Sequence, residues 1–146
     1  MNDHISDDEF NNYKKIMILI TLLIDFVLVY IYMFDKTTLI DRLFVAITMC
    51  IHVGFLTGLA TLSHILLDFS HILMFLVPLW SMFVNNKSIK TIVILLLLFI
   101  EARWIYTDEC MLNHFPTNIR WFGIGKHMTA VVNMMIAILL YQILMK

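Results

Sequence analysis

Two histidines and a carboxylate share one face of an apolar stretch. His64, Asp68 and His71 are separated by four and then three residues, the spacing that places side chains on one side of a helix. Such a donor set suits zinc or iron. Glu101, near the end of a later apolar stretch, adds a carboxylate at similar depth. These four residues form a candidate metal site.

Haem is an alternative cofactor for the same region. Haem iron takes histidine as an axial ligand, and three histidines lie within or beside the central apolar stretches: His52, His64 and His71. These residue types are compatible with a metal ion, with haem and with no cofactor.

A second polar constellation lies deeper in the apolar sequence. Asp25 is near the middle of the stretch 16–34, and His52 is near the middle of the stretch 43–62. If these stretches form adjacent helices, the two side chains lie at similar depth, and a buried carboxylate there needs a partner. We therefore expect an Asp25–His52 pair. Its functional interpretation is a proton or ion path, and its structural interpretation is a packing contact.

The polar layer as a whole has a structural interpretation, which we favour. Asn133 lies at about the depth of His71 and Glu101, with His127 and Cys110 near the rim of the layer. Polar side chains at such depths hydrogen bond across helices and hold membrane bundles together. The layer would then stabilise a structural or accessory membrane component.

A small ion or proton channel is the third interpretation. Its path would be lined by Asp25, His52 and Glu101, and a chain of 146 residues would conduct only as a homo-oligomer. An enzyme is less favoured, because the sequence contains no HExxH, no GxSxG, no phosphate loop and no dinucleotide fingerprint.

The elements that must position these residues are transmembrane helices. Hydrophobic residues make up 61% of the chain and charged residues 14%, against ~45–50% and ~25% in soluble domains. A membrane-spanning helix needs about 20 mostly apolar residues. Five stretches qualify or nearly do: 16–34, 43–62, 66–84, 88–106 and 127–145. We predict an all-α integral membrane protein with a bundle of five transmembrane helices in one domain, 16–146, after an acidic tail, 1–15.

The junction at 63–65 decides the number of crossings. A tight hairpin there gives five crossings, and a re-entrant segment gives four; we expect the hairpin. Small residues recur every fourth position in the second stretch, at Ala46, Cys50, Gly54 and Gly58. The Gly54–Gly58 pair permits close approach of a neighbouring helix. His52 points to the opposite face, so we expect the second helix to be contacted on both sides.

Charge limits the choice of partners. The formal net charge of −1 gives no reason to expect a nucleic-acid partner. The expected partners are the lipid bilayer and either further copies of the chain or another membrane protein. The ten lysines and arginines divide equally between the two sides of a five-helix bundle, so the positive-inside rule sets no orientation. The connection 107–126, with Trp121 and Phe122, is expected to lie along the headgroups.

The second half of the chain resembles an uncharacterised family of small multi-pass membrane proteins from microbes. In that family a histidine-bearing helix precedes a tryptophan helix and a Cys-Pro-Leu-Thr motif. The corresponding residues here are His64, Trp104 and Cys110-Met111-Leu112-Asn113, without the proline and threonine. The resemblance implies a multi-pass fold and no activity.

The membrane-anchor subunits of succinate dehydrogenase are a second comparison. In those subunits a helical histidine and a downstream aspartate lie near haem and quinone. Gly58, His64 and Asp68 are similar, although the glycine–histidine spacing is longer here. This resemblance implies that haem binding should be tested.

Overall fold

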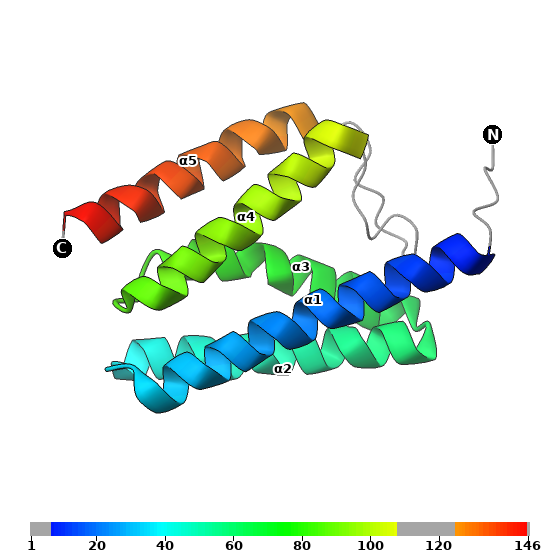
Figure 1. Ribbon diagram of the computed structural model, residues 1–146, viewed down its shortest axis with the longest axis horizontal. Coiled ribbons are helices and arrows are strands. Elements are labelled where there is room, and N and C mark those ends of the chain that lie inside the picture. The colour runs from blue at the N-terminus through cyan, green and yellow to red at the C-terminus, as the bar shows by residue number, and fades with distance from the viewer. Residues whose placement is uncertain (1–6, 108–124, 146) are drawn as a thin grey trace.

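The computed structural model is a bundle of five α-helices, and it describes residues 7–107 and 125–145. Its helices are α1 (Asp7–Phe34), α2 (Leu39–Thr61), α3 (His64–Ser81), α4 (Lys87–Thr107) and α5 (Gly125–Leu144). α2 packs against both α1 and α3, and α4 and α5 form an antiparallel pair that lies across α1 and α3 (Figure 1). The predicted all-helical class is confirmed, and each predicted apolar stretch overlaps one helix, although the stretch 66–84 continues three residues past the end of α3 at Ser81.

Three helical segments are long and apolar enough to cross a membrane, namely Phe10–Phe34, Leu39–Thr61 and His64–Ser81. α4 differs because every 18-residue window of it contains Lys90, Glu101 and Arg103. The apolar part of α5, Thr129–Leu144, is shorter. The sequence and structure are therefore consistent with insertion of at least the first three helices into a membrane.

The first two helices begin earlier than the apolar pattern predicts. α1 begins at Asp7, so the expected tail 1–15 is helical from that residue onward. Asp8 lies in its first turn, where negative charge interacts favourably with the helix dipole. α2 begins at Leu39 because Thr38 and Asp41 form a capping box. Most of the connection 107–126, including Trp121 and Phe122, lies outside the described residues.

The predicted tight hairpin between α2 and α3 is present. Leu62 adopts the left-handed conformation with φ 53°, and the backbone N–H groups of Leu62 and Ser63 both donate to the carbonyl of Gly58. The Ser63 hydroxyl then accepts from the amide of Leu66 at 3.5 Å. This turn reverses the chain in two residues, so α3 begins at His64.

The glycines of α2 allow α3 to approach closely. A Cβ atom added at Gly58 would lie 3.1 Å from side-chain carbons of Leu67, and one added at Gly54 would lie 3.3 Å from the hydroxyl of Ser70. The small-residue stripe does not continue as a contact surface, because Cys50 is exposed. His52 lies on the other side of α2, where α1 packs, so the expectation that α2 is contacted on both sides is confirmed.

Enlarging Gly58 should separate the hairpin. Gly58→Leu is expected to lower the free energy of unfolding by about 1–3 kcal/mol, because the new side chain would overpack a filled interface. Unfolding in mixed micelles by titration with sodium dodecyl sulfate measures this change. Ala60→Leu, on the exposed side of the same helix, is the matched control. Equal stability of the two variants would contradict a close contact at Gly58.

Candidate functional site

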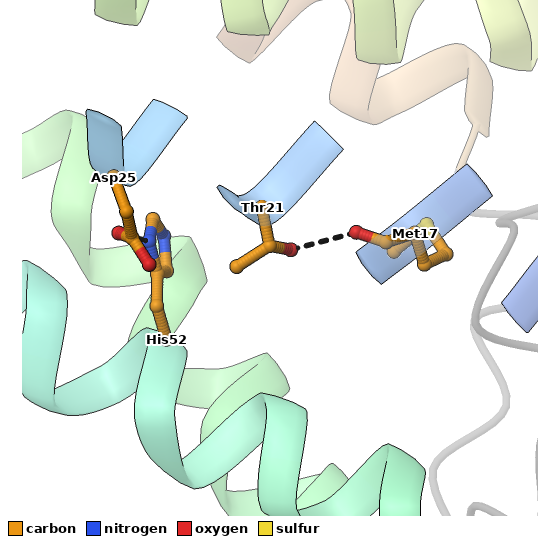
Figure 2. A network of polar contacts seen from close by, with 4 residues as sticks. All are labelled: Met17, Thr21, Asp25 and His52. Carbon is orange, nitrogen blue, oxygen red and sulfur yellow. Dashed lines mark hydrogen bonds and ion pairs between the residues drawn. The ribbon is translucent and has the colours of Figure 1, made fainter. Parts of the chain in front are cut away.

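Asp25 of α1 and His52 of α2 form a hydrogen-bonded pair inside the bundle. The carboxylate Oδ1 lies 2.5 Å from the imidazole Nδ1. The side chains are only 16% and 7% exposed, respectively, so the contact is shielded on most sides. Figure 2 shows the two side chains pointing toward one another from adjacent helices. The two residues that the depth argument pairs are thus in contact.

Thr21 extends the polar face of α1 by one helical turn. It is buried, and its hydroxyl donates to the backbone carbonyl of Met17 at 2.8 Å (Figure 2). Its hydrogen atom is therefore engaged within α1, while the oxygen can still accept a bond. Thr21 and His52 both border the same internal space.

That space is a cavity of about 180 Å³ to which all five helices contribute. Most of its wall is apolar, and its polar side chains are those of Thr21, His52, His71 and Arg103. The volume is close to that of a ~150 Å³ cavity that holds one benzene molecule in another protein. The cavity therefore has room for a small apolar group beside hydrogen-bonding side chains.

The four residues of the candidate metal site are not assembled into one. His64 is exposed at the first residue of α3, seven positions before His71, and seven positions span about 10 Å along a helix at ~1.5 Å per residue. Zinc–nitrogen bonds are only ~2.0–2.1 Å long. Within residues 7–107 and 125–145, no three His, Cys, Asp or Glu side chains are grouped so that they could hold a metal ion.

The remaining members of that set have other neighbours. Asp68 interacts electrostatically with His71 on α3. Glu101 is buried, and its Oε1 accepts from Nδ2 of Asn133 on α5 at 2.7 Å. The predicted polar layer thus exists in part, as a link between α4 and α5. Cys110 lies outside the described residues, as does the side chain of His127.

The Glu101–Asn133 bond should stabilise the α4–α5 pair. Glu101→Leu is expected to lower the free energy of unfolding by about 1–2 kcal/mol, because the Asn133 amide loses its acceptor. Glu101→Gln keeps an acceptor oxygen and should cost less than half as much. Thermal unfolding in a mild detergent compares the variants. Identical losses for the two would mean that the hydrogen bond does not carry the effect.

The three residues predicted to line a channel, Asp25, His52 and Glu101, do not all border this cavity. His52 borders the space, whereas neither Asp25 nor Glu101 is part of its wall. Asp25 contacts His52 at the α1–α2 interface, and Glu101 contacts Asn133 at the α4–α5 interface. The three side chains therefore serve two different helix interfaces.

Two charged residues of α4 make contacts that sequence reasoning missed. Lys90 is 2% exposed, and its Nζ donates to Oε1 of Gln142 on α5 at 2.5 Å. Arg103 donates from Nη2 to the hydroxyl of Tyr13 on α1 at 3.2 Å, with the guanidinium 5.5 Å from the ring centroid. The sequence does contain a signal for these contacts. Lys90 and Arg103 lie at opposite ends of an apolar run, and a charged residue beside such a run indicates a bonding partner inside the bundle.

The described helices define an all-helical protein with three segments able to cross a membrane. Comparison of the chain with protein-family models, curated proteins and solved structures found no match. The two resemblances noted in the sequence therefore stay predictions, and the function has to be argued from the interior of the bundle.

Proposed function

We propose that this chain is a multi-pass integral membrane protein whose five helices all cross the bilayer, and that it serves as a structural or accessory component. The observation that supports this role is the pairing of polar groups across helix interfaces, with one buried member in each pair. The three pairs are Asp25–His52, Lys90–Gln142 and Glu101–Asn133. Side chains used in this way hold a bundle together, since polar contacts between helices are what associates them in lipid.

The outer surface supports the membrane location. Large apolar side chains of α1 are widely exposed, including Phe26 at 71% and Leu19 at 68%. Contiguous apolar surface of this kind is rare on soluble monomers. Lipid tails would cover it without cost, so the bilayer is the main partner in this proposal.

The pairing within the second half supports crossing by α4 and α5. The residues 91–100 of α4 are uncharged, and Lys90 and Glu101 at the two ends of this run both bond to α5. Charged side chains in a membrane normally face the protein interior. Because these two face the partner helix, α4 and α5 could enter the bilayer together as a pair.

Cysteine labelling from one side of the membrane tests whether α4 crosses it, as five crossings require. In a Cys50→Ala background, the native Cys110 lies in the connection between α4 and α5. Five crossings place it opposite a cysteine introduced at Lys87, and a membrane-impermeant maleimide should then label only one of the two in sealed vesicles. Labelling of both from the same side would refute crossing by α4.

Elemental mass spectrometry and an absorption spectrum of the purified protein test the structural role. We expect no stoichiometric zinc or iron and no Soret band. A metal present at one atom per chain, or a haem spectrum, would overturn the proposal in favour of a cofactor protein. Size measurement in a mild detergent would then show whether the protein is associated with copies of itself or with another membrane protein.

A further inference from the structure

We propose that an outer groove between α1 and α2 binds one anionic phospholipid, with its phosphate on Arg42 and one acyl chain along the groove. This inference rests on the membrane location proposed above, because the bilayer is the source of such a molecule. It assigns a lipid to one place on the surface, whereas the proposed function concerns crossings and assembly.

The groove is apolar apart from Arg42 and the hydroxyl of Tyr32. α1 contributes Val29 and Tyr32 to its wall, and α2 contributes residues between Leu39 and Met49. Its volume is about 390 Å³, more than twice that of the ~150 Å³ cavity that holds one benzene molecule in another protein. Because Leu39 is 73% exposed, the groove is open to its surroundings, and a hydrocarbon chain could enter it from the side.

The groove extends from one end of the bundle toward the middle of the two helices. The last turn of α1 and the first turn of α2 lie at the same end (Figure 1), so Tyr32 and Arg42 mark the outer end of the groove. Met49 lies seven positions beyond Arg42, which is about 10 Å along a helix. Half of a ~30 Å hydrocarbon core is ~15 Å. An acyl chain in the groove would therefore be followed through most of one leaflet, with Arg42 at headgroup level.

Arg42 supplies the charge that selects the headgroup. The residue is exposed, its Nε donates to the hydroxyl of Thr37 at 3.1 Å, and its Cζ lies 5.9 Å from the centroid of the Tyr32 ring. Both contacts orient the guanidinium without neutralising it, and Arg42 makes no ion pair with any of the described residues. The two terminal nitrogens keep four N–H donors, and a guanidinium binds two phosphate oxygens side by side.

The other charges at this end favour an anionic lipid over a zwitterionic one. Lys36 and Lys87 are exposed there, and their positive charge would repel a choline group. The two aspartates have other partners: Asp41 is 1% exposed and accepts from backbone amides, and Asp35 accepts from two side chains beside the start of α4. Neither aspartate lines the groove, so a phosphate at Arg42 would meet an excess of positive charge.

Native mass spectrometry of the full chain in detergent micelles tests the proposal, because it resolves each bound lipid. Titration with phosphatidylglycerol should show a first binding step about tenfold tighter than the later steps, since only the first lipid gains charge-assisted bonds at Arg42. Phosphatidylcholine with the same acyl chains should show no such step. Arg42→Gln should weaken the first phosphatidylglycerol step about tenfold for the same reason. Lys36→Gln is the control, because it removes an exposed charge at the same end but outside the groove, and it should change the first step less than about twofold.

A second pair of variants tests the groove itself. Ala46 is exposed on the groove wall, so Ala46→Trp should fill the space of the acyl chain, keep Arg42 in place and abolish the tight step. Ile47→Trp adds the same side chain at a neighbouring position that is 42% exposed and outside the groove. It should bind phosphatidylglycerol as the wild type does. Unfolding in mixed micelles checks that both variants keep the stability of the wild type.

Four results would overturn the proposal. One is a first phosphatidylglycerol step no tighter than the later steps, and another is equal binding by the wild type and Ala46→Trp. The third is equal weakening by Arg42→Gln and Lys36→Gln, which would show a general effect of charge without a site. The fourth is a wild-type dimer that Ala46→Trp alone converts to a monomer, which would give the groove to a second copy of the chain. The cysteine labelling does not depend on phosphatidylglycerol, so a chain that crosses the membrane five times without a tight step refutes this inference alone.

Discussion

The His52→Leu variant is expected to lose about 3–4 kcal/mol of unfolding free energy. The substitution leaves the Asp25 carboxyl inside the bundle without its imidazole partner, and it must then hold either a charge or a proton among apolar side chains. Breaking a buried charged pair by removing one member typically costs ~3–5 kcal/mol. Titration with sodium dodecyl sulfate in mixed micelles measures the loss. Val53→Leu, next to His52 on an exposed face, should change stability by no more than ~0.5 kcal/mol.

The double variant separates the pair from the individual side chains. Asp25→Leu combined with His52→Leu should be less damaging than the sum of the two single changes, because the second substitution removes the stranded partner. Polar contacts in membrane proteins show coupling energies that average ~0.6 and reach ~1.7 kcal/mol. A carboxylate–imidazole contact at 2.5 Å should lie at the upper end of that range. Additive effects would mean that the contact contributes nothing beyond its separate members.

Depth along the apolar runs was enough to predict the Asp25–His52 contact. Each residue is near the middle of its run, and a tight connection makes the two runs antiparallel neighbours. The helices themselves follow from the length of the runs, since ~20 apolar residues favour a single helix. Neither step needs side-chain detail, which is why both could be taken from the sequence.

The candidate metal site could not be predicted correctly from residue spacing alone. Sharing a helix face fixes the angle of a side chain around the axis, but not its distance along the axis. His64 and His71 satisfy the angular condition and are separated by two helical turns. Glu101 lies at the expected depth, yet its orientation on α4 directs it to Asn133. The cavity was beyond the sequence for the same reason, because it depends on how five helices are rotated and spaced.

Helix ends were the other feature that hydropathy could not supply. The apolar run begins at residue 43, whereas α2 begins at Leu39, because Thr38 and Asp41 satisfy each other's backbone and side-chain groups. The capping-box pattern is present in the sequence at Thr38 and Asp41, but it lies before the apolar run and does not register in hydropathy. A short local motif therefore outweighed the hydropathy pattern at this boundary.

Asp41 has a second role, which makes it the most consequential polar residue outside the bundle interior. It is 1% exposed. Its Oδ2 accepts from the amide of Thr38 at 2.7 Å and from the Thr38 hydroxyl at 2.9 Å. Its Oδ1 accepts from the amides of Asn85 and Asn86 at 2.7 and 3.2 Å. One carboxylate thus caps α2 and fixes the turn between α3 and α4.

Asp41→Ala is accordingly expected to lower the free energy of unfolding by about 3–5 kcal/mol. Hydrogen bonds to a charged group contribute ~1.5–3 kcal/mol each, and donors left without an acceptor add a desolvation cost. Asp41→Asn should cost roughly half as much, since its amide oxygen can still accept from the α3–α4 turn while its NH₂ group faces the Thr38 amide. Unfolding in mixed micelles, with hydrogen exchange at the Asn85 and Asn86 amides, measures both effects.

Asp35→Ala is the matched control for Asp41. Asp35 lies at the same end of the bundle, but it accepts only from the side chains of Ser88 at 2.7 Å and Asn86 at 3.3 Å among its described hydrogen bonds. Those side chains can turn to water when the carboxylate is removed, whereas backbone amides held in a turn cannot. The control should therefore lose less than ~1 kcal/mol. Equal losses in Asp35→Ala and Asp41→Ala would show that negative charge at this end, and not the bonding of backbone amides, stabilises the fold.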